Sequence, residues 1–134
     1  MKYTIYNNYM YKYNINILQQ IAYNLANSIN PPYTILLRGN LGAGKTTFSQ
    51  FFLQPILVNK NQSVTSPTFN IVSVYDTIKG DVWHVDLYRI NNESEIINLG
   101  LLEFIHVGIA LIEWPELIYN CVINSNIPYK IMDL

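Results

Sequence analysis

The chain contains one cysteine, Cys121, among its 134 residues. A single thiol can form neither an internal disulfide nor a cysteine-based zinc site. No apolar stretch approaches the roughly 18 residues of a membrane-spanning helix. The first residues, Met1–Thr4, lack the apolar segment of a signal peptide. These absences predict a reduced, soluble protein of the cytoplasm.

Charge is also scarce, because charged residues form only 13% of the chain, about half of the usual ~25%. Residues 1–75 carry five Lys and Arg and no acid, whereas residues 76–134 carry three Lys and Arg and nine acids. This asymmetry either arises by chance or indicates a phosphate site of the first half facing metal-binding carboxylates of the second. No run of Lys and Arg is dense enough to predict a nucleic-acid surface.

The apolar material that is present suffices for one packed domain. Half of the residues are hydrophobic and 13% are aromatic, a composition that excludes a disordered chain. Two full-size domains need roughly 200 residues or more. We therefore interpret residues 1–134 as a single domain.

The pattern of apolar residues predicts alternating strands and helices. The predicted strands are 3–6, 33–37, 70–75, 82–87, 108–112 and 127–132. The predicted helices are 15–29 with Asn14 as its cap, a helix ending near Gln54, 93–102, and 115–119. This alternation predicts an α/β fold with a largely parallel sheet.

The segment 39–46, G-N-L-G-A-G-K-T, matches the phosphate-binding motif G-x-x-x-x-G-K-[ST] in full. A buried strand precedes it and a helix follows it, as the motif requires. Glycines let backbone N–H groups approach a polyphosphate, the lysine reaches the β- and γ-phosphates, and the threonine hydroxyl binds Mg²⁺. We therefore predict a P-loop NTPase-like, three-layer α/β/α domain with a mostly parallel central sheet. The predicted nucleotide contacts are Gly39, Leu41, Gly42, Ala43, Gly44, Lys45, Thr46 and Thr47.

Two acidic residues follow apolar runs at points where strands are expected to end. Glu113 follows 109–112, and Asp86 follows 82–85. Such acids complete the metal side of P-loop sites. Either one is expected to bind Mg²⁺ directly or through water, while the other orients the attacking water. The alternative is that each is an ordinary strand-end acid paired with a base such as Arg89.

Four segments together resemble one family of P-loop ATPases. Residues 38–48 resemble G-D-L-G-A-G-K-T-T-F, with Asn40 in place of the usual Asp, and residues 64–69 resemble V-x-S-P-T-F. Residues 84–90 resemble H-x-D-L-Y-R-L, and residues 111–116 resemble I-E-W-P-E. This set is similar to the TsaE (YjeE) family of tRNA threonylcarbamoyladenosine biosynthesis.

The resemblance implies a weak Mg²⁺-dependent ATPase that acts on a threonylcarbamoyltransferase complex of TsaD/TsaB type, through which tRNA is reached. Lys45 would hold the phosphates, and Thr46 with Glu113 would hold Mg²⁺. Asp86 would lie in the outer shell of the metal or position water. Trp114 would lie close to the nucleotide. The residues implied in a switch that senses the γ-phosphate and contacts the partner are Ser66, Pro67 and Thr68.

Two other functions are considered. A small P-loop kinase needs a lid with several arginines, and the chain has only Arg38 and Arg89. A non-catalytic, nucleotide-dependent interaction module is the other alternative. We interpret His84 as a structural or switch-contact residue, His106 as a surface residue and Cys121 as buried or half-buried.

Overall fold

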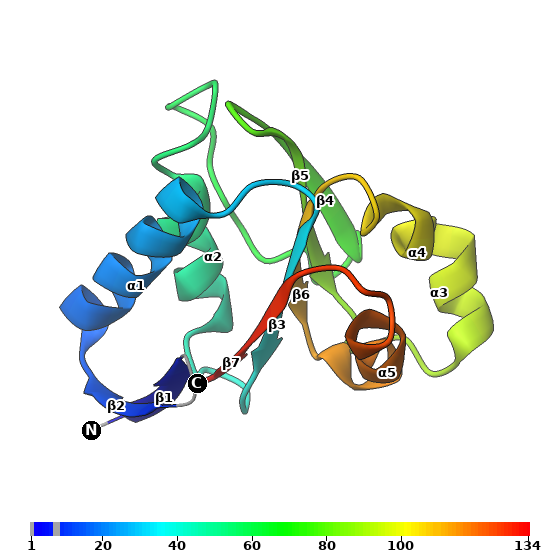
Figure 1. The fold of residues 1–134 in the computed structure, drawn as a ribbon, viewed down its shortest axis with the longest axis horizontal. Coiled ribbons are helices and arrows are strands. Elements are labelled where there is room, and N and C mark those ends of the chain that lie inside the picture. Colours follow the sequence, from blue (N-terminus) through cyan, green and yellow to red (C-terminus); the bar gives the residue numbers. More distant parts are fainter. Residues whose placement is uncertain (1, 7–8) are drawn as a thin grey trace.

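The computed structural model describes residues 2–6 and 9–134, and their strands form one seven-stranded sheet (Figure 1). The strand order is β2-β1-β7-β3-β6-β5-β4. The strands are β1 Lys2–Tyr6, β2 Tyr9–Tyr13, β3 Tyr33–Arg38, β4 Val72–Thr77, β5 Gly80–Asp86, β6 Ile109–Glu113 and β7 Tyr129–Asp133. The four central strands, β7, β3, β6 and β5, run parallel, and antiparallel pairs close both edges.

Helices cover both faces of this sheet, which gives the three layers that the sequence predicts (Figure 1). One face carries α1 Ile15–Ser28 and α2 Lys45–Leu53. The other carries α3 Glu93–Leu99, α4 Leu101–Phe104, the 3₁₀ turn η1 Pro115–Leu117 and α5 Tyr119–Ile123. A separate cluster of buried apolar side chains lies under each helical layer. The α/β/α prediction is therefore confirmed.

Most predicted elements form within two residues of their expected bounds. Asn14 caps α1 as predicted, because its side-chain oxygen accepts a hydrogen bond from the Ile17 N–H at 3.1 Å. The predicted helix 93–102 is instead split into α3 and α4. Gly100 adopts a left-handed conformation with φ 76° and ends α3 there. Strand β2 was not predicted at all.

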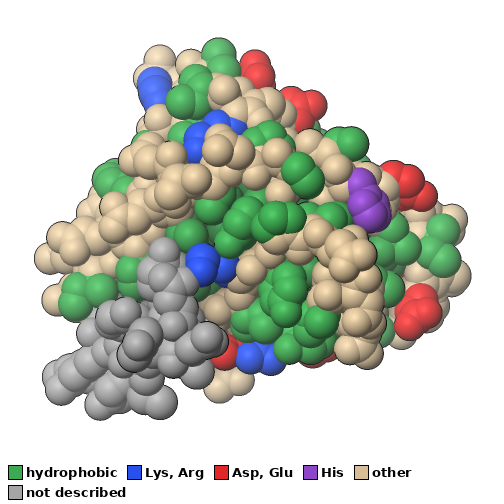
Figure 2. Space-filling view, viewed as in Figure 1, with side chains coloured by type: hydrophobic (Ala, Val, Ile, Leu, Met, Phe, Trp, Pro, Cys, Tyr) green, Lys and Arg blue, Asp and Glu red, His purple; other side chains and the backbone are tan. Residues whose placement is uncertain are grey.

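The predicted exposure of two side chains, those of His106 and Cys121, can be compared with the structure. His106 is exposed, as predicted, but Cys121 is exposed as well, so its interpretation as buried or half-buried was wrong. On the face shown in Figure 2, Lys and Arg side chains are scattered singly and form no basic patch. Within the described residues, no helix is both long and apolar enough to cross a membrane.

Gly108 provides a test of the packing that places β6. A Cβ at this position would lie 2.2 Å from the Phe104 ring, and that ring stacks on Trp83 with centroids 4.2 Å apart. We expect Gly108→Ala to lower the free energy of unfolding by about 1–3 kcal/mol, the usual cost of overpacking. Urea denaturation measures this loss. In a Phe104→Leu background the same substitution should cost clearly less, and an equal cost in both backgrounds would contradict the steric explanation.

Candidate functional site

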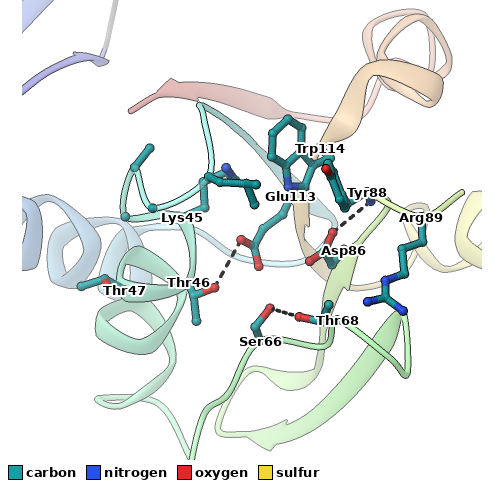
Figure 3. A pocket seen from close by; sticks show the side chains of 14 residues that line it. Lys45, Thr46, Thr47, Ser66, Thr68, Asp86, Tyr88, Arg89, Glu113 and Trp114 are labelled. Atoms are coloured by element: carbon teal, nitrogen blue, oxygen red, sulfur yellow. Dashed lines mark hydrogen bonds between the residues drawn. The ribbon is translucent and has the colours of Figure 1, made fainter.

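A pocket of about 310 Å³ opens where β3, β5 and β6 end (Figure 3). The parallel register places Leu37 of β3 and Asp86 of β5 on either side of Glu113 of β6. The carboxyl ends of the strands therefore meet at one level, the usual binding edge of an α/β sheet. The lining residues are Leu41, Gly42, Ala43, Gly44, Lys45, Thr46, Thr47, Ser66, Thr68, Asp86, Tyr88, Arg89, Glu113 and Trp114.

The phosphate-motif loop connects β3 to α2 along one wall of this pocket. Gly44 has φ 111° and immediately precedes Lys45, the first residue of α2, so the positive end of that helix faces the pocket. Gly39 lies at the base of the loop and not among the lining residues. A Cβ at Gly39 would come within 2.8 Å of the Leu134 carbonyl oxygen, so this position requires glycine.

The base of the loop is also fixed to strand β7. The Arg38 guanidinium donates two hydrogen bonds to the Asp133 carboxylate, at 2.6 and 2.8 Å. The Leu134 N–H donates to the Arg38 carbonyl oxygen at 2.9 Å. Asp133 raises the pKa of Arg38, chiefly through this bidentate hydrogen bond. These bonds set the point from which the loop leaves the sheet.

Lys45 lies inside the pocket with its ammonium group turned back onto the loop. It donates hydrogen bonds to the carbonyl oxygens of Gly39 at 2.5 Å and Asn40 at 2.9 Å. Its Nζ also lies 4.1 Å from the centroid of the Trp114 ring. Burial lowers the pKa of Lys45, while the Glu113 and Asp86 charges oppose that shift. A bound phosphate anion would supply a negative charge next to the buried Lys45 ammonium and so stabilise its charged form.

Thr46, Glu113 and Asp86 present oxygen atoms to the same space, with Glu113 between the other two (Figure 3). Thr46 Oγ1 and Glu113 Oε1 are 3.4 Å apart, longer than an ordinary O–H···O hydrogen bond of about 2.7 Å. Burial raises the pKa of Asp86, and the Glu113 charge raises it further. Two neighbouring buried carboxylates and a hydroxyl fit a hard divalent cation, and Mg²⁺ in particular retains several waters beside a few protein oxygens.

Glu113 has a second contact on the side away from Thr46. His84 Nε2 lies 2.7 Å from Glu113 Oε2, and both side chains are buried. The sequence assigned His84 only a structural or switch-contact role. The structure joins it directly to a predicted metal-binding carboxylate, a contact that the sequence did not predict.

Trp114 lines the pocket because of an unusual backbone conformation. Its φ is 55°, in the left-handed region that non-glycine residues seldom adopt. This turn places the indole between the Lys45 ammonium and the Tyr88 ring, whose centroid is 4.9 Å away. The resemblance implied that Trp114 lies close to the nucleotide, and the structure places it in the lining of the pocket.

The predicted switch residues lie across the pocket from the loop (Figure 3). The hydroxyls of Ser66 and Thr68 are 2.9 Å apart and hydrogen-bonded. Pro67 is buried between them and does not line the pocket. Phe69, which follows Thr68, is 82% exposed. The Arg89 guanidinium lies 4.5 Å from the centroid of the Phe69 ring. Within the described part of the chain, Arg89 forms no salt bridge with Asp86 or Glu113.

Comparison with known proteins agrees with this site. A sequence model of the family described as "Threonylcarbamoyl adenosine biosynthesis protein TsaE" matches residues 13–133. The chain belongs to the TsaE family. The match covers the loop, the Ser66–Thr68 segment and the ends of β5 and β6, and so it spans every wall of the pocket.

Three relatives in that family each carry the name "tRNA threonylcarbamoyladenosine biosynthesis protein TsaE". The Rickettsia prowazekii protein is 41% identical over 69% of this chain and 64% of its own length. The Aquifex aeolicus protein is 39% identical over 72% of this chain and 68% of its own. The Bacillus subtilis protein is 42% identical over 66% of this chain and 54% of its own. The chain thus spans less than two thirds of the Rickettsia prowazekii relative.

Asp86 provides a test of the electrostatics of the pocket. Because folding raises its pKa, the folded state binds more protons than the unfolded state between the two pKa values. The contribution of Asp86 to the stability of the wild-type chain therefore falls as pH rises through that window. We expect Asp86→Asn to be more stable than wild type at neutral pH in EDTA without nucleotide, with the difference vanishing below about pH 4.

Thermal unfolding followed across this pH range measures the effect. The asparagine keeps an oxygen for the Tyr88 N–H, which Asp86 Oδ1 accepts at 2.9 Å, so the local turn is preserved. A variant less stable than wild type at neutral pH would contradict the electrostatic account.

Proposed function

We propose that the chain binds Mg²⁺ and ATP in this pocket and hydrolyses the ATP slowly in support of tRNA threonylcarbamoyladenosine biosynthesis. One observation carries the proposal: a complete phosphate-binding loop faces Glu113 and Asp86 within one pocket. Membership of the TsaE family supports the pathway.

In this proposal each side chain has a separate task. The Lys45 ammonium exchanges its carbonyl partners for oxygens of the β- and γ-phosphates, and backbone N–H groups of the loop hold the same phosphates. The Thr46 hydroxyl and the Glu113 carboxylate hold Mg²⁺. When bound, Mg²⁺ would neutralise the negative charge that develops on the transferred phosphoryl group.

Asp86 is proposed to act on the attacking water. Its buried carboxylate is more basic than an exposed one, because burial raises its pKa. A water oxygen forms the new bond to the γ-phosphorus, the bond from that phosphorus to the β–γ bridging oxygen breaks, and Asp86 accepts the water proton. The products are ADP and inorganic phosphate.

The proposed partner is a threonylcarbamoyltransferase complex of TsaD/TsaB type, and tRNA is reached through that complex. Support comes from the segment Ser66–Phe69. It lines the pocket through two hydroxyls and extends to an exposed aromatic side chain. A partner that contacts this segment is therefore coupled to the contents of the pocket.

The two arginines of the chain are not placed to form the lid that a small P-loop kinase needs. Of the two arginines in the chain, Arg38 is held by Asp133 and does not line the pocket. Arg89 alone cannot provide the several arginines that a kinase lid uses.

Lys45→Ala tests the role of the loop. The substitution removes a lysine that lines the pocket, so we expect ATP turnover to fall about 10²–10³-fold, the scale for one preorganised electrostatic group. Phosphate release is measured with and without the partner proteins. Lys60→Ala is the matched control, because Lys60 is exposed and, among the described contacts, its ammonium group donates only to the Gln54 and Pro55 carbonyl oxygens.

Unchanged turnover in Lys45→Ala would refute the assignment of the loop. Transfer of phosphate to a metabolite would indicate a kinase. Tight ATP binding by the wild-type chain without turnover under either condition would indicate a non-catalytic interaction module and contradict hydrolysis.

Glu113→Gln separates metal binding from nucleotide binding. The amide keeps the size of the side chain but removes a negative charge from the proposed metal site. We expect nucleotide binding in EDTA close to that of wild type, with hydrolysis strongly reduced and a higher Mg²⁺ concentration required for half-maximal rate. A normal Mg²⁺ dependence would transfer the metal-binding role to Asp86.

A further inference from the structure

His84 occupies a fully buried position on the face of β5 that α1 and α2 cover. Its exposed fraction is 0%. Side chains two residues apart share one face of a strand, so His84 shares this face with Val82 and Asp86. Val82 belongs to the apolar cluster under α1 and α2, as does Leu111, the partner of His84 on β6. Val82 and Leu111 therefore give His84 apolar neighbours on its own strand and on β6, whereas Asp86 and Ser73, its partner on β4, are polar.

A histidine in such an environment needs a reason beyond packing. Among the described residues its Nδ1 has no hydrogen-bond partner, and the atom is inaccessible to solvent, which is unfavourable for a buried polar atom. An apolar side chain such as those of Val82 or Leu111 would avoid this cost. The polar contact that offsets it is at the other ring nitrogen, Nε2.

That contact reaches Glu113 diagonally across the two strands. Leu111 is level with His84, and Glu113 lies two residues further along β6 on the same face. His84 Nε2 lies 2.7 Å from Glu113 Oε2, while Oε1 of the same carboxylate faces the Thr46 hydroxyl at 3.4 Å. The two carboxylate oxygens are therefore divided between His84 and the pocket.

This division fixes the orientation of the carboxylate. A glutamate side chain has three rotatable torsions, and its terminal torsion is only loosely restricted by itself. A hydrogen bond from the buried imidazole to Oε2 removes that freedom and presents Oε1 to the pocket. Hydrogen-bond partners that orient a metal-binding side chain commonly change metal affinity 10–100-fold.

We propose that His84 is a positioning residue that holds Glu113 with one oxygen directed at the Mg²⁺ site beside Thr46. This inference rests on the proposed function, because it assumes that Mg²⁺ binds with the nucleotide. His84 itself contacts neither the metal nor the nucleotide in this proposal.

The test measures the affinity for Mg²⁺ by calorimetry, with a non-hydrolysable ATP analogue bound to the chain. We expect His84→Leu to weaken Mg²⁺ binding about 10-fold or more, and to leave binding of the analogue in EDTA unchanged. His84→Gln offers an amide N–H at a similar reach to Nε2 and should recover most of the affinity. His84→Asn has a shorter side chain and should resemble His84→Leu.

A double-substitution cycle with Glu113→Gln distinguishes positioning from general damage to the core. If His84 acts through Glu113, adding His84→Leu to Glu113→Gln should weaken Mg²⁺ binding no further. Thr34→Val is the matched control, since Thr34 Oγ1 is also buried, with no hydrogen-bond partner in the part of the chain that the structure describes, but lies outside the pocket lining. This control should bind Mg²⁺ as wild type does.

The outcomes separate the two proposals. If the wild-type chain binds the analogue without any dependence on Mg²⁺, the proposed function fails and the role of His84 fails with it. If wild type binds Mg²⁺ and His84→Leu binds it equally well, only the role of His84 is overturned. Should His84→Leu not fold, equal Mg²⁺ affinity in His84→Gln and His84→Asn would overturn it.

Discussion

The register of three parallel strands at Glu113 is the constraint on which the site depends. Glu113 pairs with Leu37 of β3 on one side and Asp86 of β5 on the other. A shift of one residue in either pairing would turn alternate side chains to the opposite face of the sheet. The carboxylates would then leave the pocket, and the loop after β3 would face apolar side chains instead. The apolar runs that bury β3 and β6 on both faces therefore also keep the carboxylates in the pocket.

Around that register the pocket balances charges that would each be unfavourable alone. The buried Lys45 ammonium has a lowered pKa and the buried Asp86 carboxylate a raised one, both chiefly because burial disfavours the charged form. Their mutual attraction offsets part of this cost. The ammonium also contacts two carbonyl oxygens of its own loop and the face of Trp114. Such an arrangement suits a site prepared for a polyanion and a divalent cation together.

The errors of the sequence interpretation have local physical causes. Strand β2 was missed because Tyr9–Tyr13 has no aliphatic run, although its pairing with β1 is local, with Tyr6 opposite Tyr9. The helix 93–102 was predicted as continuous because its apolar spacing continues through Gly100, where the backbone turns left-handed. Tyr88 and Arg89 were not in the predicted site set, although they follow Asp86 directly and line the pocket. Arg89 lies against Phe69 and, within the described residues, forms no salt bridge with Asp86 or Glu113. This contact joins two segments, and no local sequence pattern encodes it.

The sequence by itself determined the α/β class, the phosphate-binding loop and the identity of the two strand-end acids. These features depend on residue spacing within single elements, where backbone geometry leaves few alternatives. Only the tertiary structure decided that His84 bonds to Glu113, that Trp114 faces Lys45 and that Arg38 is held by Asp133. Each of these contacts joins different elements, and its geometry follows from strand order and register, which depend on the packing of the whole sheet.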